Sequence, residues 1–155
     1  MSQQHTPLQQ LAELGLELPE VAAPVAAYVP AIHVGNQVWT SGQLPFASGE
    51  LPATGKVGQD VTPDHAYDLA KQAALNALAA VHSCVGLDNV TRVLKIVGYV
   101  NSVDGFSGQP AVVNGASELM REIFGSAGDH VRSAVGVAEL PLNSPVEIEL
   151  VVEVS

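Results

Sequence analysis

Cysteine is nearly absent from this sequence: Cys84 is the single thiol among 155 residues. One thiol excludes an intramolecular disulfide and any metal site built from several thiolates. The five histidines show no spacing typical of a zinc site. The sequence frames of a nucleophile elbow and of a phosphate-binding loop are absent as well. The sequence therefore predicts no metal centre and none of these common catalytic motifs.

Basic residues are also scarce. Lys and Arg number 6 against 16 Asp and Glu, which gives a formal net charge of −10. A field of this sign repels phosphate backbones, so nucleic acid is disfavoured as a partner. The only arginines are Arg92, Arg121 and Arg132. An anionic ligand of this acidic chain would need one of these few positive groups.

Long apolar runs are missing: no stretch approaches the roughly 18 residues of a membrane-spanning helix. The first residues also lack the basic start and apolar centre of a signal peptide, so we expect a cytoplasmic domain. Hydrophobic residues nevertheless make up 47% of the chain and charged residues only 14%. This balance predicts a sizeable core and some apolar surface that another subunit covers.

Apolar periodicity and turn residues predict the element order ββαβαββ. The expected elements are an amphipathic segment to about residue 20, a hairpin turning at Gly35 and Asn36, a loop over 45–61, a helix from Thr62 to about Cys84 with Cys84 on its apolar face, a strand over 89–100, a helix from Pro110 to Phe124, and strands over 131–140 and 146–154. We expect residues 141–145 to join the last two strands as a hairpin. The predicted fold class is α+β, a mixed sheet with two helices on one face. The other face must then be polar or pack against other copies.

Two charged residues are candidates for chemistry. Arg132 could be an ordinary ion-pair partner, or its guanidinium could bind the carboxylate of a small ligand through two parallel hydrogen bonds. Composition leaves both interpretations open. In the last strand, residues 146–154, apolar and mostly acidic positions alternate, which is typical of a half-solvated strand. Glu147 lies at its start, where strands often border clefts.

Uncharged candidates allow structural interpretations too. Ser41 and Gly42 close a predicted strand and could offer hydroxyl and backbone N–H donors to a small anion. Tyr28 could line a pocket or belong to the core of the hairpin. Asn114 could contact a ligand or be an exposed polar residue on its helix.

Several motifs together carry a family resemblance. They are Tyr28 before the Gly-Asn turn, residues 38–45 (VWTSGQLP), 58–61 (GQDV), 93–100 (VLKIVGYV), 104–106 (DGF), 132–141 (RSAVGVAELP) and 146–149 (VEIE). In these segments, which span residues 28–154, the chain resembles the RidA family, also called YjgF. The resemblance implies a chorismate-mutase-like fold, assembled as a homotrimer with ligand sites in the clefts between subunits.

The resemblance also implies an activity. Members of the best-known type hydrolyse reactive 2-imino or 2-enamino acids to a 2-oxo acid and ammonia, without a metal or organic cofactor. By this resemblance Arg132 would bind the substrate carboxylate, and Glu147 would hold and deprotonate the attacking water. The other implied pocket residues are Tyr28, Ser41, Gly42, Asn114 and Ala134.

The chain departs from the family pattern in two places. Ala134 stands where many relatives carry a cysteine, so only its backbone could serve the site. Residues 1–27 form an N-terminal extension before the RidA-like domain, residues 28–155, which indicates a divergent branch. Two alternatives to the deaminase therefore stay open. One is a trimeric binding or sensor protein for small carboxylates, and the other is the endoribonuclease activity ascribed to some relatives, which the net charge disfavours.

Overall fold

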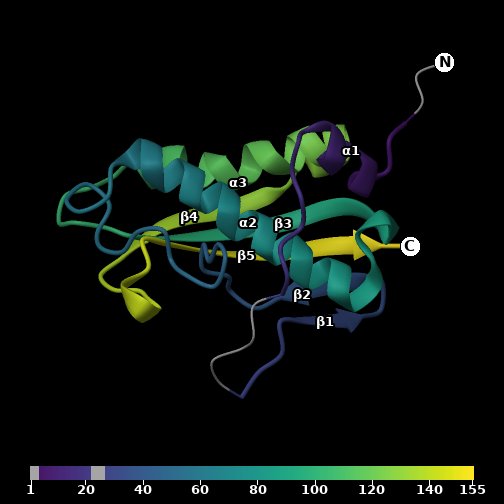
Figure 1. Cartoon of the computed structure of the whole chain (residues 1–155), viewed down its shortest axis with the longest axis horizontal. Coiled ribbons are helices and arrows are strands. Elements are labelled where there is room, and N and C mark those ends of the chain that lie inside the picture. The colour runs from purple at the N-terminus through teal and green to yellow at the C-terminus, as the bar shows by residue number, and fades with distance from the viewer. Residues whose placement is uncertain (1–3, 22–26) are drawn as a thin grey trace.

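The computed structural model describes residues 4–21 and 27–155, and these form a layer of helices over one mixed sheet (Figure 1). In chain order the elements are α1 (Pro7–Glu13), β1 (Ala31–Val34), β2 (Gln37–Thr40), α2 (Pro63–Val85), β3 (Val90–Asn101), α3 (Gln109–Phe124), β4 (Val131–Val137) and β5 (Val146–Val154). Three short 3₁₀ turns, Leu87–Asn89, Gly125–Gly128 and Pro141–Asn143, connect some of them. The predicted α+β class is confirmed, with α1 as a third, short helix.

Capping residues set the limits of the helix α2, as the sequence predicts. The Thr62 hydroxyl accepts a hydrogen bond from the His65 backbone N–H at 3.2 Å, which caps α2. At the other end Gly86 adopts a φ of 81°, a conformation that glycine permits without strain. One detail is wrong: Cys84 is exposed and does not belong to the apolar face of α2.

The order of strands corrects one prediction. The sheet runs β1-β2-β5-β3-β4, so β4 and β5 do not pair and residues 141–145 do not close a hairpin. The chain leaves β3, crosses through α3 and returns as β4 parallel to β3. A parallel neighbouring strand requires such a crossover. Because β4 occupies one edge of β3, the other edge is free, and β5 pairs antiparallel there. The final strand thus lies in the centre of the sheet.

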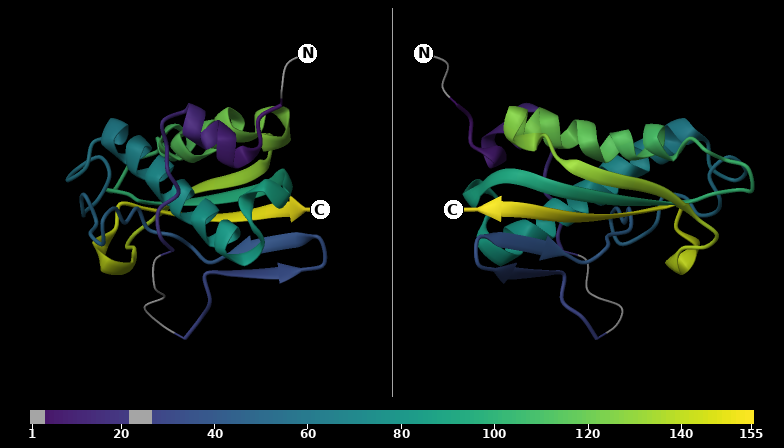
Figure 2. Two further views of the ribbon diagram at one scale, coloured as in Figure 1. Left: turned by 45° about the vertical axis from the view of Figure 1, so that its right-hand side comes forward. Right: turned by 180° about the vertical axis from the view of Figure 1, so that it is seen from behind.

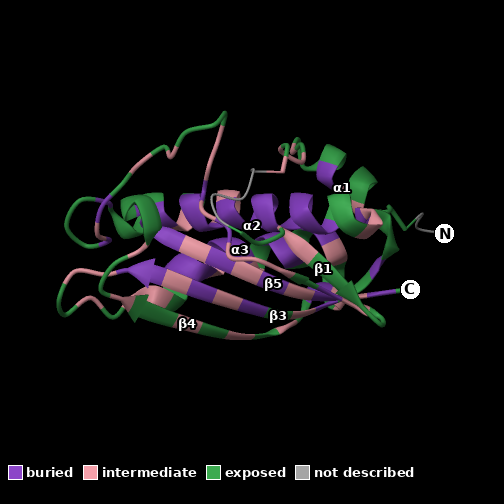
Figure 3. Ribbon diagram, turned by 90° about the horizontal axis from the view of Figure 1, so that it is seen from below, coloured by how far each residue is buried: buried purple, intermediate pink, exposed green. Residues whose placement is uncertain are grey.

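One sheet face packs under the helices, and the other is uncovered by this chain. In both views of Figure 2 the helices lie on one side of the sheet. On β5 the even-numbered side chains are buried beneath the helices, and the odd-numbered ones are half-buried on the other face. Figure 3 shows this alternation on β3 and β5, whereas the edge strands β1 and β4 are largely exposed. We call the uncovered side the open face.

The N-terminal segment packs against the rest of the chain. Leu11, in α1, is 2% exposed and belongs to the hydrophobic core. The Gln10 amide donates to the Glu122 carbonyl of α3 at 3.1 Å, and the Leu8 backbone N–H donates to Asp88. Among the described residues, no helix has the length and apolar character needed to cross a membrane.

Gly115 lets α2 and α3 approach closely, so a side chain at this position should destabilise the fold. A β-carbon at Gly115 would stand 2.1 Å from the Tyr67 carbonyl oxygen of α2, a backbone atom that cannot rotate away. Helix propensity alone would favour alanine by about 1 kcal/mol. We expect overpacking to dominate, so that Gly115→Ala lowers the free energy of unfolding by about 1–3 kcal/mol.

Urea denaturation measures this difference. Ala111→Gly, at an exposed position of the same helix, is the control for propensity without a packing change. A Gly115→Ala variant as stable as the wild type would contradict the proposed close contact.

Candidate functional site

Arg132 lies on the edge strand β4 and is held against α3. Its Nη1 donates to the Ser117 hydroxyl at 3.1 Å, and its Nη2 donates to the Pro110 carbonyl at 3.2 Å. Within the described ranges, the ion pairs are Lys56–Glu139 and Arg121–Asp129, and neither includes Arg132. Of the two interpretations of Arg132, the ordinary ion pair is therefore absent from the part of the chain that the structure describes.

Two further predicted residues lie beside this guanidinium. Asn114 occupies the helical turn of α3 between Pro110 and Ser117, the two residues that bind Arg132. Ala134 follows Arg132 by two positions on β4, so both side chains face the helices, and Ala134 packs against the core. We call Arg132, Asn114 and Ala134 the arginine half-site.

Glu147 lies elsewhere, at the start of β5 on the open face. A β-carbon on Gly42 would stand 2.7 Å from Glu147 Oε1, so the absence of a side chain at Gly42 makes room for this carboxyl group. Burial, and secondarily the charge of Glu149, raises the pKa of Glu147 above its ordinary value. We call Glu147 and Gly42 the glutamate half-site.

A second carboxyl group next to Glu147 has a partner of its own. The Tyr99 hydroxyl donates to Glu149 Oε1 at 2.9 Å, and Tyr99 is the register partner of Glu147 across β3 and β5. Burial, and then the bond to Glu149, raises the pKa of Tyr99. Sequence reasoning missed Tyr99, although the antiparallel register could have indicated it.

Ser41 does not offer its predicted donors to an anion. Its hydroxyl donates to the Val29 carbonyl at 2.6 Å, and its backbone N–H donates to the Pro30 carbonyl at 2.8 Å. These bonds fix the segment before β1 to the end of β2. Tyr28 belongs to that segment and is 48% exposed. It therefore does not belong to the core of the hairpin.

The two half-sites lie on opposite faces of the sheet. Arg132 shares the face of its partner Ile96, beneath the helices, whereas Glu147 shares the open face with Tyr99. Strand β3 lies between β4 and β5, so the strands that carry Arg132 and Glu147 are roughly 10 Å apart across the sheet. One copy of the chain therefore does not bring Arg132 and Glu147 into one pocket.

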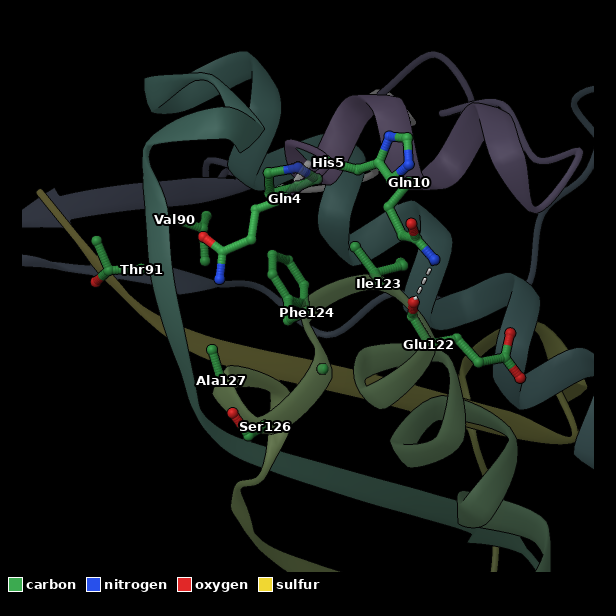
Figure 4. Close-up of a pocket in the computed structure, with 12 residues that line it drawn as sticks. Gln4, His5, Gln10, Val90, Thr91, Glu122, Ile123, Phe124, Ser126 and Ala127 are labelled. Carbon is green, nitrogen blue, oxygen red and sulfur yellow. Dashed lines mark hydrogen bonds between the residues drawn. The ribbon is translucent and has the colours of Figure 1, made fainter. Parts of the chain in front are cut away.

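Two surface cavities lie away from Glu147. The larger, about 500 Å³, lies between the N-terminal segment and the end of α3, where Gln10 bonds to Glu122 (Figure 4). The smaller, about 310 Å³, is lined by residues including Ser117 and His130 and so adjoins the arginine half-site. Over residues 4–21 and 27–155, no three His, Cys, Asp or Glu side chains form a group that could hold a metal ion.

The chain has a chorismate-mutase-like α+β fold. The sequence model of the family described as "YjgF/chorismate mutase-like, putative endoribonuclease" matches residues 9–154. The chain belongs to this family, the RidA (YjgF) family.

Its relatives include a named deaminase. The chain is 40% identical over 147 residues to protein TCP17 of Trypanosoma cruzi, covering 94% of this chain and 92% of TCP17. It is 32% identical over 139 residues to the 2-iminobutanoate/2-iminopropanoate deaminase of Dermatophagoides farinae, covering 88% and 93% of the two chains. The crystal structure of Atu1372 from Agrobacterium tumefaciens superposes with a TM-score of 0.89 at 42% identity, covering 97% of this chain and 93% of Atu1372.

The environment of Glu147 generates a prediction about its titration. We expect NMR titration of ¹³C-labelled protein to show a Glu147 pKa above the ordinary carboxyl value. Glu149→Gln should lower this pKa without restoring it fully, because burial, the larger cause, remains. An unshifted Glu147 would contradict this account of the glutamate half-site.

The same shift links Glu147 to stability. A carboxyl pKa that is higher in the folded than in the unfolded state means that folding favours the protonated form. The stabilisation of the fold by protonated Glu147 is therefore fully present below the unfolded pKa and is lost as pH rises through the folded pKa. Glu147→Gln should therefore raise the melting temperature at neutral pH. Glu153→Gln, farther along the same face of β5, is the matched control.

Proposed function

We propose that the protein hydrolyses small 2-imino acids to 2-oxo acids and ammonia, at a site that two copies of the chain form together. The observation that carries the proposal is Arg132, a guanidinium that is bound to α3 and lacks an acidic partner among the described residues. The named deaminase among the relatives supports the choice of reaction.

Assembly is proposed because each half-site alone is incomplete. The open face and its edges expose large apolar side chains, which is typical of a surface that another subunit covers. These residues are Ile32, Val34, Trp39, Val131 and Val135, which are 42–68% exposed. A trimer in which β4 of one copy approaches the open face of the next would bring Arg132 of one protomer towards Glu147 of its partner.

The chemistry follows from the two charges. Arg132 would bind the substrate carboxylate and so fix the electrophilic iminium carbon. Glu147 would take a proton from a water as its oxygen bonds to that carbon, giving a carbinolamine. The proton then passes from Glu147 to the amine nitrogen. As the C–N bond breaks and ammonia leaves, the hydroxyl oxygen forms the carbonyl and gives its proton to Glu147. Glu147 passes this proton to the ammonia, which departs as ammonium, and the carboxylate is regenerated.

The raised pKa of Glu147 supports this role, because a carboxyl group that accepts and returns a proton near neutral pH needs a pKa above its ordinary value. Binding of a small carboxylate without turnover is the competing function. It would use Arg132 in the same way but would not require Glu147.

Turnover of freshly generated 2-iminobutanoate tests the reaction. We expect the wild type to accelerate release of 2-oxobutanoate and ammonia, Arg132→Ala to lose about a hundredfold or more in kcat/KM, and Glu147→Gln to lose kcat by a similar factor. Binding of 2-oxobutanoate should disappear in Arg132→Ala and survive in Glu147→Gln.

The controls separate the candidate functions. Arg92→Ala removes an exposed arginine near the start of β3, away from both half-sites, and should leave the rate unchanged. A wild-type protein that binds 2-oxobutanoate but does not exceed the uncatalysed rate of hydrolysis would favour the binding protein over the enzyme.

Mixed assemblies test the shared site. When Arg132→Ala and Glu147→Gln chains are co-assembled in equal amounts, about a quarter of the interfaces combine an intact Arg132 with an intact Glu147. We expect about that fraction of the wild-type rate, although each variant alone is inactive. If the mixture stays inactive after subunit exchange is verified with two affinity tags, the residues do not act across subunits.

A further inference from the structure

We infer that Ser117 and His130 are positioning residues that hold the Arg132 guanidinium in its carboxylate-binding orientation. This inference rests on the proposed function, because it assigns a task to the groups around Arg132. The reaction itself does not require either residue, and neither was a candidate from the sequence.

The geometry is a continuous chain of hydrogen bonds. Arg132 Nη1 lies 3.1 Å from Ser117 Oγ, and Ser117 Oγ lies 2.8 Å from His130 Nε2. His130 Nδ1 lies 2.7 Å from the Gly128 carbonyl oxygen. Arg132 Nη2 makes the remaining contact, to the Pro110 carbonyl. The guanidinium is thus bound at two points, one of which depends on a hydroxyl group that can rotate.

The direction of each bond follows from the chemistry of the groups. A carbonyl oxygen only accepts, so Nδ1 of His130 must carry a proton. In the neutral ring Nε2 is then the acceptor, and the Ser117 hydroxyl donates to it. A guanidinium only donates, so the lone pairs of Ser117 Oγ face Arg132. His130 therefore fixes the rotation of the hydroxyl that receives Arg132.

The surrounding charges leave Arg132 available for a ligand. Glu118, next to Ser117 in sequence, accepts a hydrogen bond from the Tyr67 hydroxyl of α2. Asp129, next to His130, is paired with Arg121 at 3.0 Å. Both nearby carboxylates thus have other partners, and Arg132 is instead held by neutral groups. Its positive charge is oriented without being neutralised.

Substrate affinity is the first measurement. Because a hydrogen bond to a charged group is lost, we expect Ser117→Ala to raise KM for 2-iminobutanoate and Kd for 2-oxobutanoate about tenfold, with kcat within about twofold of wild type. Ser117→Thr keeps the hydroxyl and should restore both values. His130→Phe removes the acceptor for the hydroxyl proton and should raise both values about threefold.

Two controls isolate the effect. Ser83→Ala removes a helix serine whose hydroxyl bonds to Ala80 of its own helix, and His65→Phe replaces an exposed histidine at the start of α2. Both should keep wild-type KM and Kd. In ¹⁵N NMR spectra the His130 ring should show a protonated Nδ1, and Ser117→Ala should shift its Nε2 resonance.

The outcomes separate this inference from the proposed function. Unchanged KM and Kd in Ser117→Ala, or equal losses in Ser117→Ala and a folded Ser117→Thr, would overturn the positioning role. If the wild type binds 2-oxobutanoate without hydrolysing the imine, the proposed reaction fails, and the Kd series alone decides the positioning role. If it binds no 2-oxobutanoate, both fail.

Discussion

The contact between the Arg132 guanidinium and α3 is the interaction on which the rest of the account depends. Arg132 lies on an edge strand, where a long side chain would ordinarily extend into solvent with many rotamers. The Ser117 hydroxyl and the Pro110 carbonyl restrict it instead. Since these partners are neutral, the positive charge keeps its attraction for a carboxylate. In a chain with a net charge of −10, an anionic substrate would need such a locally positive group.

The alternation of side chains along strands imposes the second constraint. Arg132 faces the helices and Glu147 faces away, so no movement of a rotamer could bring them together within one copy. Gly42 leaves room for the Glu147 carboxyl group on a face that this chain does not cover. A reaction that requires both charges therefore requires assembly, and the exposed apolar side chains of the open face and the edge strands provide a surface for it.

Local signals explain which parts of the fold the sequence predicts. Thr62 and Gly86 bound α2 through contacts within a few residues, and the Gly35–Asn36 turn determines the register of β1 and β2. The hairpin after β4 was predicted wrongly because adjacency in sequence does not decide which strands pair. Strand β5 instead inserts between β2 and β3, which depends on pairing between segments far apart in sequence, and no local residue pattern in 141–145 indicates that pairing.

In the site, too, local motifs indicate the residues, whereas their arrangement depends on contacts between distant segments. The family motifs indicate Arg132 and Glu147 as candidates, but the sheet face that each occupies depends on the strand register. The sequence does not predict the contact between Ser117 and His130. The two residues are 13 positions apart and join α3 to the segment before β4, so no helical or strand spacing relates them.

A crystal structure of the assembled protein with 2-oxobutanoate bound would test the central claim most directly. We expect the ligand carboxylate to lie against Arg132 of one protomer, which stays bound to Ser117, and Glu147 of a neighbouring protomer to face the 2-oxo carbon. A ligand bound within a single protomer, or an Arg132 side chain turned to solvent away from any neighbouring copy, would contradict it.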